Sequence, residues 1–116
     1  MGKIIPFSRA RALSNTTALE RIQRFWLDGN YVPSAYAQSR MAQRGFDDQD
    51  LAHLVFETGG VSSHRLVDGL WRYKVSGKSV DGKKMAAVFE FEGSLMKLVT
   101  VHDRFKGETV KRKKRR

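Results

Sequence analysis

The chain contains no cysteine, which excludes disulfide bonds and thiolate-ligated metal sites. No apolar run approaches the roughly 20 residues with which a helix crosses a bilayer. The first residues, MGKIIPFSRARAL, carry only a short apolar patch between basic residues, so they lack the longer apolar core of a secretory signal. We therefore expect a cytoplasmic protein that makes no membrane contact.

Common nucleotide and hydrolase motifs are also absent. The sequence has no Walker A loop, no GxGxxG fingerprint and no GxSxG elbow. Its three histidines, His53, His64 and His102, stand far apart, without the paired spacing of a metal site. These absences argue against a nucleoside-triphosphate enzyme, a dinucleotide enzyme and an α/β-hydrolase. We expect neither a cofactor nor a metal.

Acidic residues are scarce, with 12 Asp and Glu against 22 Lys and Arg, for a formal net charge of +10. Six positive charges come from the terminal run KRKKRR and three from Lys3, Arg9 and Arg11, which leaves +1 for residues 12–110. A run of like charges attracts polyanions through counterion release. We interpret the run as nucleic-acid-binding: Lys111, Arg112, Lys113, Lys114, Arg115 and Arg116.

The length of 116 residues fits one domain, and a hydrophobic content of 41% is that of an ordinary globular protein. We expect residues 1–13 to form a basic flexible arm, residues 14–104 a single α+β domain, and residues 105–116 a basic C-terminal tail.

Three helices are predicted in the first half of the chain. SNTTALERIQRFWLDG has apolar residues at three- to four-residue spacing, and Thr17 with Glu20 matches a capping box. SAYAQSRMAQR follows the linker NYVP and stops at Gly45. DDQDLAHLVFETGG begins at Asp47 or Asp48 and ends at its two glycines.

After Gly60 the apolar period changes from 3.6 to 2, which predicts the strands VSSHRLV, LWRYKVSG, KMAAVFEFE and LMKLVTVHD. Asp-Gly and Glu-Gly pairs between them predict tight turns. In the last strand, strict alternation places Leu95, Val99 and Val101 on one face. The expected fold is α+β, with three N-terminal helices packed on one face of a four-stranded antiparallel meander sheet.

RNA can be cut without a metal when a base removes the 2′-hydroxyl proton, an acid protonates the leaving oxygen and cations stabilise the phosphate. Arginine suits the phosphate because its planar fork donates two hydrogen bonds at once. The side chains that supply such groups here are Tyr36, Arg40, Arg44, His64, Arg72, Lys74, Lys97 and His102.

Each of these side chains also has an ordinary structural interpretation. Arg40 and Arg44 are close enough in sequence to pair with Asp47, Asp48 or Asp50 and simply fix the turn between two helices. The others can be solvent-facing or core side chains.

The segments SRMAQRGFDDQDL, WRYKVSG, VDGKKMAAVFEF and MKLVTVHD together resemble the small bacterial family called domain of unknown function 4258. The resemblance covers about residues 34–103. It implies a fold related to the RelE- and barnase-like ribonuclease toxins, in which the sheet face and the helix leading into it handle RNA.

The resemblance also implies site residues. Its paired arginines, its first long strand and its closing strand correspond to Arg40, Arg44, Arg72, Tyr73 and Thr100. The family commonly has a histidine where this chain has Tyr36, and a phenol is a poor base at neutral pH. If the family cleaves RNA, two alternatives follow for this chain: it is slow or inactive, or it uses His102 or His64 as the base.

Three hypotheses follow. The first is an RNA-directed protein of ribonuclease-toxin type, and the second a nucleic-acid-binding module of a phage or mobile element that does not cut. The third is a protein-interaction or inhibitor domain with an acidic or antitoxin-like partner. We favour nucleic acid, RNA over DNA, and leave catalysis open. The catalytic candidates are His102, His64 and Tyr36, and the substrate-binding candidates are Arg40, Arg44, Arg72, Lys74, Tyr73 and Thr100.

Overall fold

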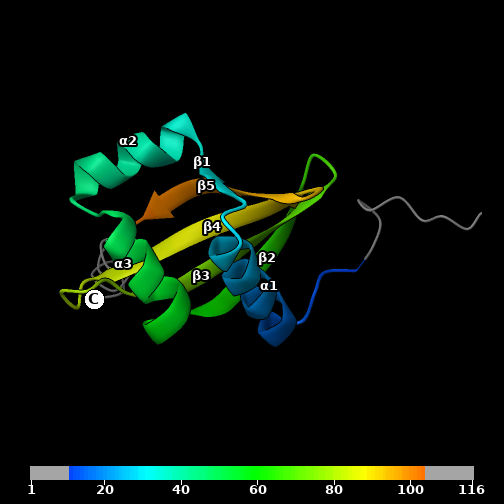
Figure 1. Ribbon diagram of the computed structural model, residues 1–116, viewed down its shortest axis with the longest axis horizontal. Coiled ribbons are helices and arrows are strands. Elements are labelled where there is room, and N and C mark those ends of the chain that lie inside the picture. Colours follow the sequence, from blue (N-terminus) through cyan, green and yellow to red (C-terminus); the bar gives the residue numbers. More distant parts are fainter. Residues whose placement is uncertain (1–10, 104–116) are drawn as a thin grey trace, which may run out of the picture.

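The computed structural model describes residues 11–103. The elements are α1 (Asn15–Leu27), β1 (Tyr31–Pro33), α2 (Ala35–Arg44), α3 (Asp48–His53), the π-helical turn η2 (Leu54–Thr58), β2 (Gly60–Val67), β3 (Leu70–Lys78), β4 (Lys84–Glu92) and β5 (Leu95–His102). The strands of the described range form one sheet in the order β1-β5-β4-β3-β2 (Figure 1).

The sheet differs from the predicted four-stranded antiparallel meander. Tyr31–Pro33, which we expected to be a linker, form the strand β1 and pair in parallel with β5, opposite Met96, Lys97 and Leu98. The described sheet therefore has five strands and is mixed. The expectation was wrong because a three-residue strand is too short to show a period of two and exists only through its pairing with β5.

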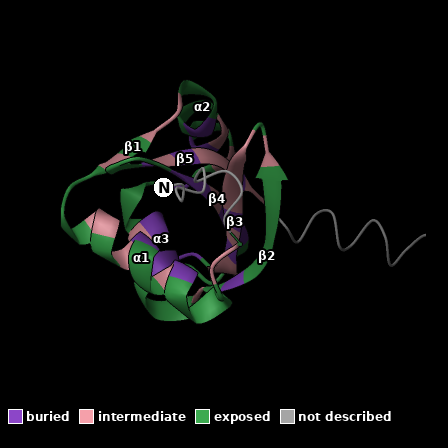
Figure 2. Ribbon diagram, turned by 90° about the vertical axis from the view of Figure 1, so that its right-hand side faces the viewer, coloured by how far each residue is buried: buried purple, intermediate pink, exposed green. Residues whose placement is uncertain are grey.

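The placement of the helices is also only partly as expected. Figure 2 shows the sheet curving around α1 and α3, while α2 lies apart beside β5. The contacts agree, because α1 and η2 pack on β2 and β3, and α2 packs on β5. The core between α1, α3 and the sheet contains the fully buried side chains Ile22, Leu51, Leu54, Val75, Met85, Phe89, Met96, Leu98 and Val101.

Helix α1 begins one turn earlier than predicted. The hydroxyl of Ser14 accepts a hydrogen bond from the Thr17 backbone N–H, so Ser14 is the N-cap. The capping box expected from Thr17 and Glu20 is therefore wrong. Ala18 and Ile22 face the core as the apolar spacing requires.

Helix α2 follows the sequence prediction closely. The Ser34 hydroxyl accepts from the Ala37 N–H at 3.0 Å, and Gly45 ends the helix in the left-handed conformation with φ 74°. Ala37 and Met41 are buried on the side that packs against the rest of the domain. The adjacent edge of the helix carries Tyr36, Arg40 and Arg44.

Helix α3 begins at a reciprocal capping box, in which Asp47 and Asp50 each accept the other's backbone N–H at 3.0 Å. This confirms Asp47 as one of the two predicted caps. The helix then widens into η2, where the Gln23 side chain of α1 donates to the Val55 carbonyl at 2.9 Å. A side chain on α1 thus supports this turn.

A β-bulge changes which side chains of β5 face the core. The register shifts between Val88, opposite Thr100, and Phe89, opposite Leu98, so Val99 is the extra residue. The strict alternation predicted for Leu95, Val99 and Val101 is therefore wrong. The buried residues of β5 are Met96, Leu98 and Val101, because the bulge reverses the facing of the strand partway along.

The predicted terminal segments fall largely outside the described residues. Only residues 11–13 of the expected arm lie inside the range, and the whole expected tail, residues 105–116, lies beyond it. Their boundaries stay predictions. Within residues 11–103, no helix is both long enough and apolar enough to cross a bilayer.

The end of η2 approaches β3 so closely that Gly77 has no room for a side chain. A Cβ there would lie 2.8 Å from the Thr58 hydroxyl oxygen and 2.9 Å from the Gly59 Cα. Gly77→Ala is expected to lower the free energy of unfolding by about 1–3 kcal/mol in chemical denaturation. Gly60→Ala, a control with open space around it, should change it by less than about 0.5 kcal/mol. Equal stability of the two variants would contradict this contact.

Candidate nucleic-acid interface

The face of the sheet opposite α1 and α3 carries a polar groove. Tyr73 and Val75 are buried in the core, so alternation along β3 places Arg72 and Lys74 on the other face. The groove has a volume of about 310 Å³. We call it the sheet-face groove, and its polar lining includes Ser63, Arg65, Arg72, Lys74, Thr100 and His102.

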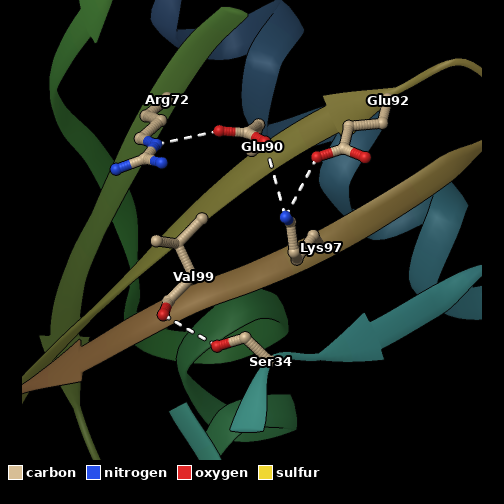
Figure 3. Close-up of polar contacts among 6 residues, drawn as sticks. All are labelled: Ser34, Arg72, Glu90, Glu92, Lys97 and Val99. Carbon is tan, nitrogen blue, oxygen red and sulfur yellow. Dashed lines mark hydrogen bonds and ion pairs between the residues drawn. The ribbon is translucent and has the colours of Figure 1, made fainter. Parts of the chain in front are cut away.

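One cation of this groove is held by a buried carboxylate. Glu90 is 3% exposed, and its Oε1 lies 2.8 Å from the Nε of Arg72. Lys97 Nζ lies 3.9 Å from Glu90 Oε2 and 3.1 Å from Glu92, so Glu90 sits between two cations (Figure 3). A buried carboxylate requires such partners. The Nε of Arg72 is therefore occupied by its ion pair with Glu90. The sequence analysis did not predict this ion pair.

Two other cations of the groove are not neutralised. Neither Arg65 nor Lys74 forms an ion pair within the described residues. Arg65 lies directly opposite Arg72 across the β2–β3 hairpin. Since Glu90 already pairs with Arg72, it is Arg65 and Lys74 whose charges stay available to an anion in the groove.

Arg65 was absent from the sequence candidates, although a signal for it exists. Asp68 has φ 51° and Gly69 has φ 85°, and the two form the turn that sets Val67 opposite Leu70. Counting back from a two-residue turn places position 65 opposite position 72.

His102 lies at the end of β5 and lines the groove. Burial lowers its pKa below the ordinary value of 6.5, and the nearby positive charges of Lys74 and Arg40 lower it further. Its imidazole is therefore neutral at pH 7 and able to accept a proton. His102, one of the predicted catalytic residues, is therefore near enough to Lys74 and Arg40 for their charges to act on it.

His64 has different surroundings. It borders the groove, but its ring packs with aromatic rings of β3, 5.3 Å from that of Trp71 and 6.2 Å from that of Tyr73. Tyr73 itself is 2% exposed, and its hydroxyl accepts the Leu13 N–H at 2.9 Å. These contacts leave Tyr73 outside the groove, on the core side of the sheet.

Arg40 and Arg44 do not form the ion pairs that offered the structural explanation for them. Over residues 11–103 no ion pair joins either arginine to an acid, and Asp47 and Asp50 cap α3 instead. The Nε atoms of both arginines are buried without a hydrogen-bond partner in that range. Neither guanidinium is therefore neutralised by a carboxylate of the described residues.

The remaining candidates from α2 and β5 are placed as follows. Tyr36 is 61% exposed, and the guanidinium carbon of Arg40 lies 6.0 Å from the centre of its ring. Arg44 lines a second groove of about 440 Å³ rather than the sheet-face groove. Thr100 lines the sheet-face groove, and its buried hydroxyl has no hydrogen-bond partner in the described structure. The predicted residues 111–116 lie outside the described range.

No group of three His, Asp or Glu side chains in the described part of the chain is arranged to hold a metal ion. Comparisons with protein-family models, with curated proteins and with solved structures found no match to this chain. The resemblance to the domain of unknown function 4258 family therefore stays a prediction.

The surroundings of His102 give a direct test of the groove's electrostatics. In an NMR titration of the imidazole protons, the pKa of His102 is expected below 6.5, and Lys74→Gln should raise it by removing a like charge. The exposed α1 substitution Arg24→Gln is the control. No response to Lys74→Gln would contradict this geometry. The same lowered pKa should cost stability as the pH falls below about 6.5, because unfolded His102 binds its proton first.

Proposed function

We propose that this protein binds single-stranded RNA and that the sheet-face groove holds the phosphate backbone. The observation that carries the proposal is the pair of cations Arg65 and Lys74, which have no ion-pair partner among residues 11–103. Cations without a carboxylate partner can bind an external anion, and phosphate is the anion that repeats along a polymer. We also propose that the fold is related to that of the ribonuclease toxins and that the protein is cytoplasmic.

The groove has donors suited to phosphate. Arg65 offers a planar fork that can donate two hydrogen bonds to one phosphate, and Lys74 offers an ammonium point charge. The Thr100 hydroxyl, with its hydrogen-bonding capacity unused in the described structure, adds a neutral donor. A groove of about 310 Å³ is of small-ligand size. It accommodates one nucleotide of a single strand better than a duplex.

Tyr36 supplies a surface for a base. Its ring is largely exposed and lies beside the Arg40 guanidinium. Bases of single strands stack on exposed aromatic rings with little sequence preference, and arginine strengthens such contacts. The residues 111–116, where six cations follow one another, would add attraction at low salt without adding specificity.

Metal-independent RNA cleavage is the second candidate function, and neutral His102 beside Lys74 and Arg40 supports it. His102 would take the 2′-hydroxyl proton while the 2′-oxygen attacks the phosphorus. The bond from phosphorus to the 5′-oxygen breaks, and the 5′-oxygen takes a proton from solvent. Lys74 would stabilise the charge that gathers on the phosphate. The products are a 2′,3′-cyclic phosphate and a 5′-hydroxyl, so DNA would not be cut.

Binding is tested with the double variant Arg65→Gln, Lys74→Gln and a labelled unstructured RNA. Its affinity is expected to fall about tenfold or more at low salt, and its salt slope to fall by about 1.4 because two phosphate contacts are lost. Its stability should stay near wild type, since no described ion pair is broken. Arg72→Gln, in contrast, should lower the free energy of unfolding, because it leaves the buried Glu90 carboxylate without its closest partner.

Arg24→Gln on α1 is the control for charge loss and should leave RNA affinity unchanged. Unchanged affinity in the groove double variant would contradict the proposal.

Cleavage is tested by incubating the full chain with the same RNA in the presence of a chelator. If the chain is a nuclease, fragments ending in 2′,3′-cyclic phosphate should appear, and His102→Gln should slow their formation by about 100-fold or more without a comparable loss of binding. RNA that is bound but stays intact would remove the cleavage candidate and leave the binding proposal in place.

A further inference from the structure

The second groove lies on the same face of the sheet as the first. Alternation along β3 places Lys78 on the face that also carries Arg72 and Lys74, and Lys78 pairs with Lys84 of β4. Asp103, which follows His102 of β5, lines the second groove. The two grooves therefore succeed one another along the strands.

Helix α2 packs on β5 and lines the second groove through Arg44. Its N-cap Ser34 is bonded to the backbone of Leu98 and Val99, and its last residue Arg44 lines the second groove beside Asp103. The charge of Arg40, one turn earlier, acts on His102 in the first groove. Arg40 thus acts on the first groove and Arg44 lines the second.

The second groove also contains cations that form no ion pair within the described residues. Over the described range, Arg44, Lys78 and Lys83 form no ion pair, and Asp103 is a lone carboxylate against them. The Arg44 Nε is buried without a hydrogen-bond partner there. The Lys83 ammonium lies 5.8 Å from the centre of the Phe46 ring. Both grooves are therefore lined by cations that no described carboxylate neutralises.

We propose that the second groove is a further phosphate subsite and that the two grooves form one track, walled by α2, for a continuous single strand. The inference rests on the proposed RNA binding and deepens it by assigning the length of the ligand. Arg65 lies opposite Arg72, and from Arg72 to Lys78 is six residues of strand, so Arg65 and Lys78 are separated by about 20 Å along the strands at roughly 3.3 Å per residue. That distance corresponds to about six stacked nucleotides at roughly 3.4 Å each.

Such a track has a characteristic dependence on ligand length. A trinucleotide reaches one groove only, whereas a nonanucleotide reaches both. The second contact is then intramolecular and gains from a high effective concentration. Affinity should rise in a step once the strand is long enough to span the distance, rather than in proportion to its number of nucleotides.

The experiment measures the affinity of the full chain for oligouridylates of three, six and nine nucleotides at one salt concentration. For the wild type, affinity is expected to rise at least tenfold between three and nine nucleotides. In the variant Lys78→Gln, Lys83→Gln this rise should fall to about threefold or less, because only the sheet-face groove still binds phosphate. Thr58 bonds only the backbone of Lys78, so the substitution spares that contact. A denaturation midpoint close to that of the wild type verifies folding.

The charge-matched control is Arg21→Gln, Arg24→Gln on the exposed side of α1, which should keep the wild-type length dependence. A full rise in affinity in the Lys78, Lys83 variant would overturn the track. In the Lys78, Lys83 variant, where only the first groove keeps its cations, trinucleotide binding that does not depend on Arg65 and Lys74 would instead overturn the proposed function itself. The two failures are therefore distinguishable.

Discussion

The arrangement of the candidate surface depends on how Ser34 joins α2 to β5. Its backbone N–H donates to the Leu98 carbonyl at 2.9 Å and its hydroxyl donates to the Val99 carbonyl at 3.0 Å, while the same hydroxyl caps α2. The Val99 carbonyl can accept this bond because Val99 is the extra residue of a bulge. One serine therefore both starts the helix and fixes it beside the strand. As a consequence Arg40 acts on His102 and Arg44 reaches the second groove.

The second determinant is an unequal distribution of acids. Glu90 is buried and forms ion pairs with Arg72 and, at a longer distance, with Lys97, which also pairs with Glu92. Arg65 and Lys74 on the same surface have no described carboxylate to pair with. The buried acid thus neutralises cations at the centre of the sheet, and the cations Arg65 and Lys74 keep their positive charge. A surface built in this way is stable without a ligand and still attracts anions, which is the physical basis for the RNA proposal.

The sequence predicts local features well and long-range ones poorly. The limits of α2 and the Asp47 cap follow from neighbouring residues, and alternation correctly places Lys74 opposite the core. Strand β1 is defined only by its partner, and the bulge at Val99 only by the register with β4, so neither has a local pattern. The gathering of His102, Lys74 and Arg40 depends on both, which is why the candidates could be proposed but their grouping could not.

Binding of RNA at this surface, as proposed, requires that the unpaired cations Arg65 and Lys74 hold phosphate. The most direct measurement is NMR mapping of the isotope-labelled full chain during addition of a uridine trinucleotide. The largest amide shift changes on the described domain are expected at Ser63, Lys74, Thr100 and His102, with α1 unaffected. Changes confined to α1, or none on this face at saturating trinucleotide, would contradict the account.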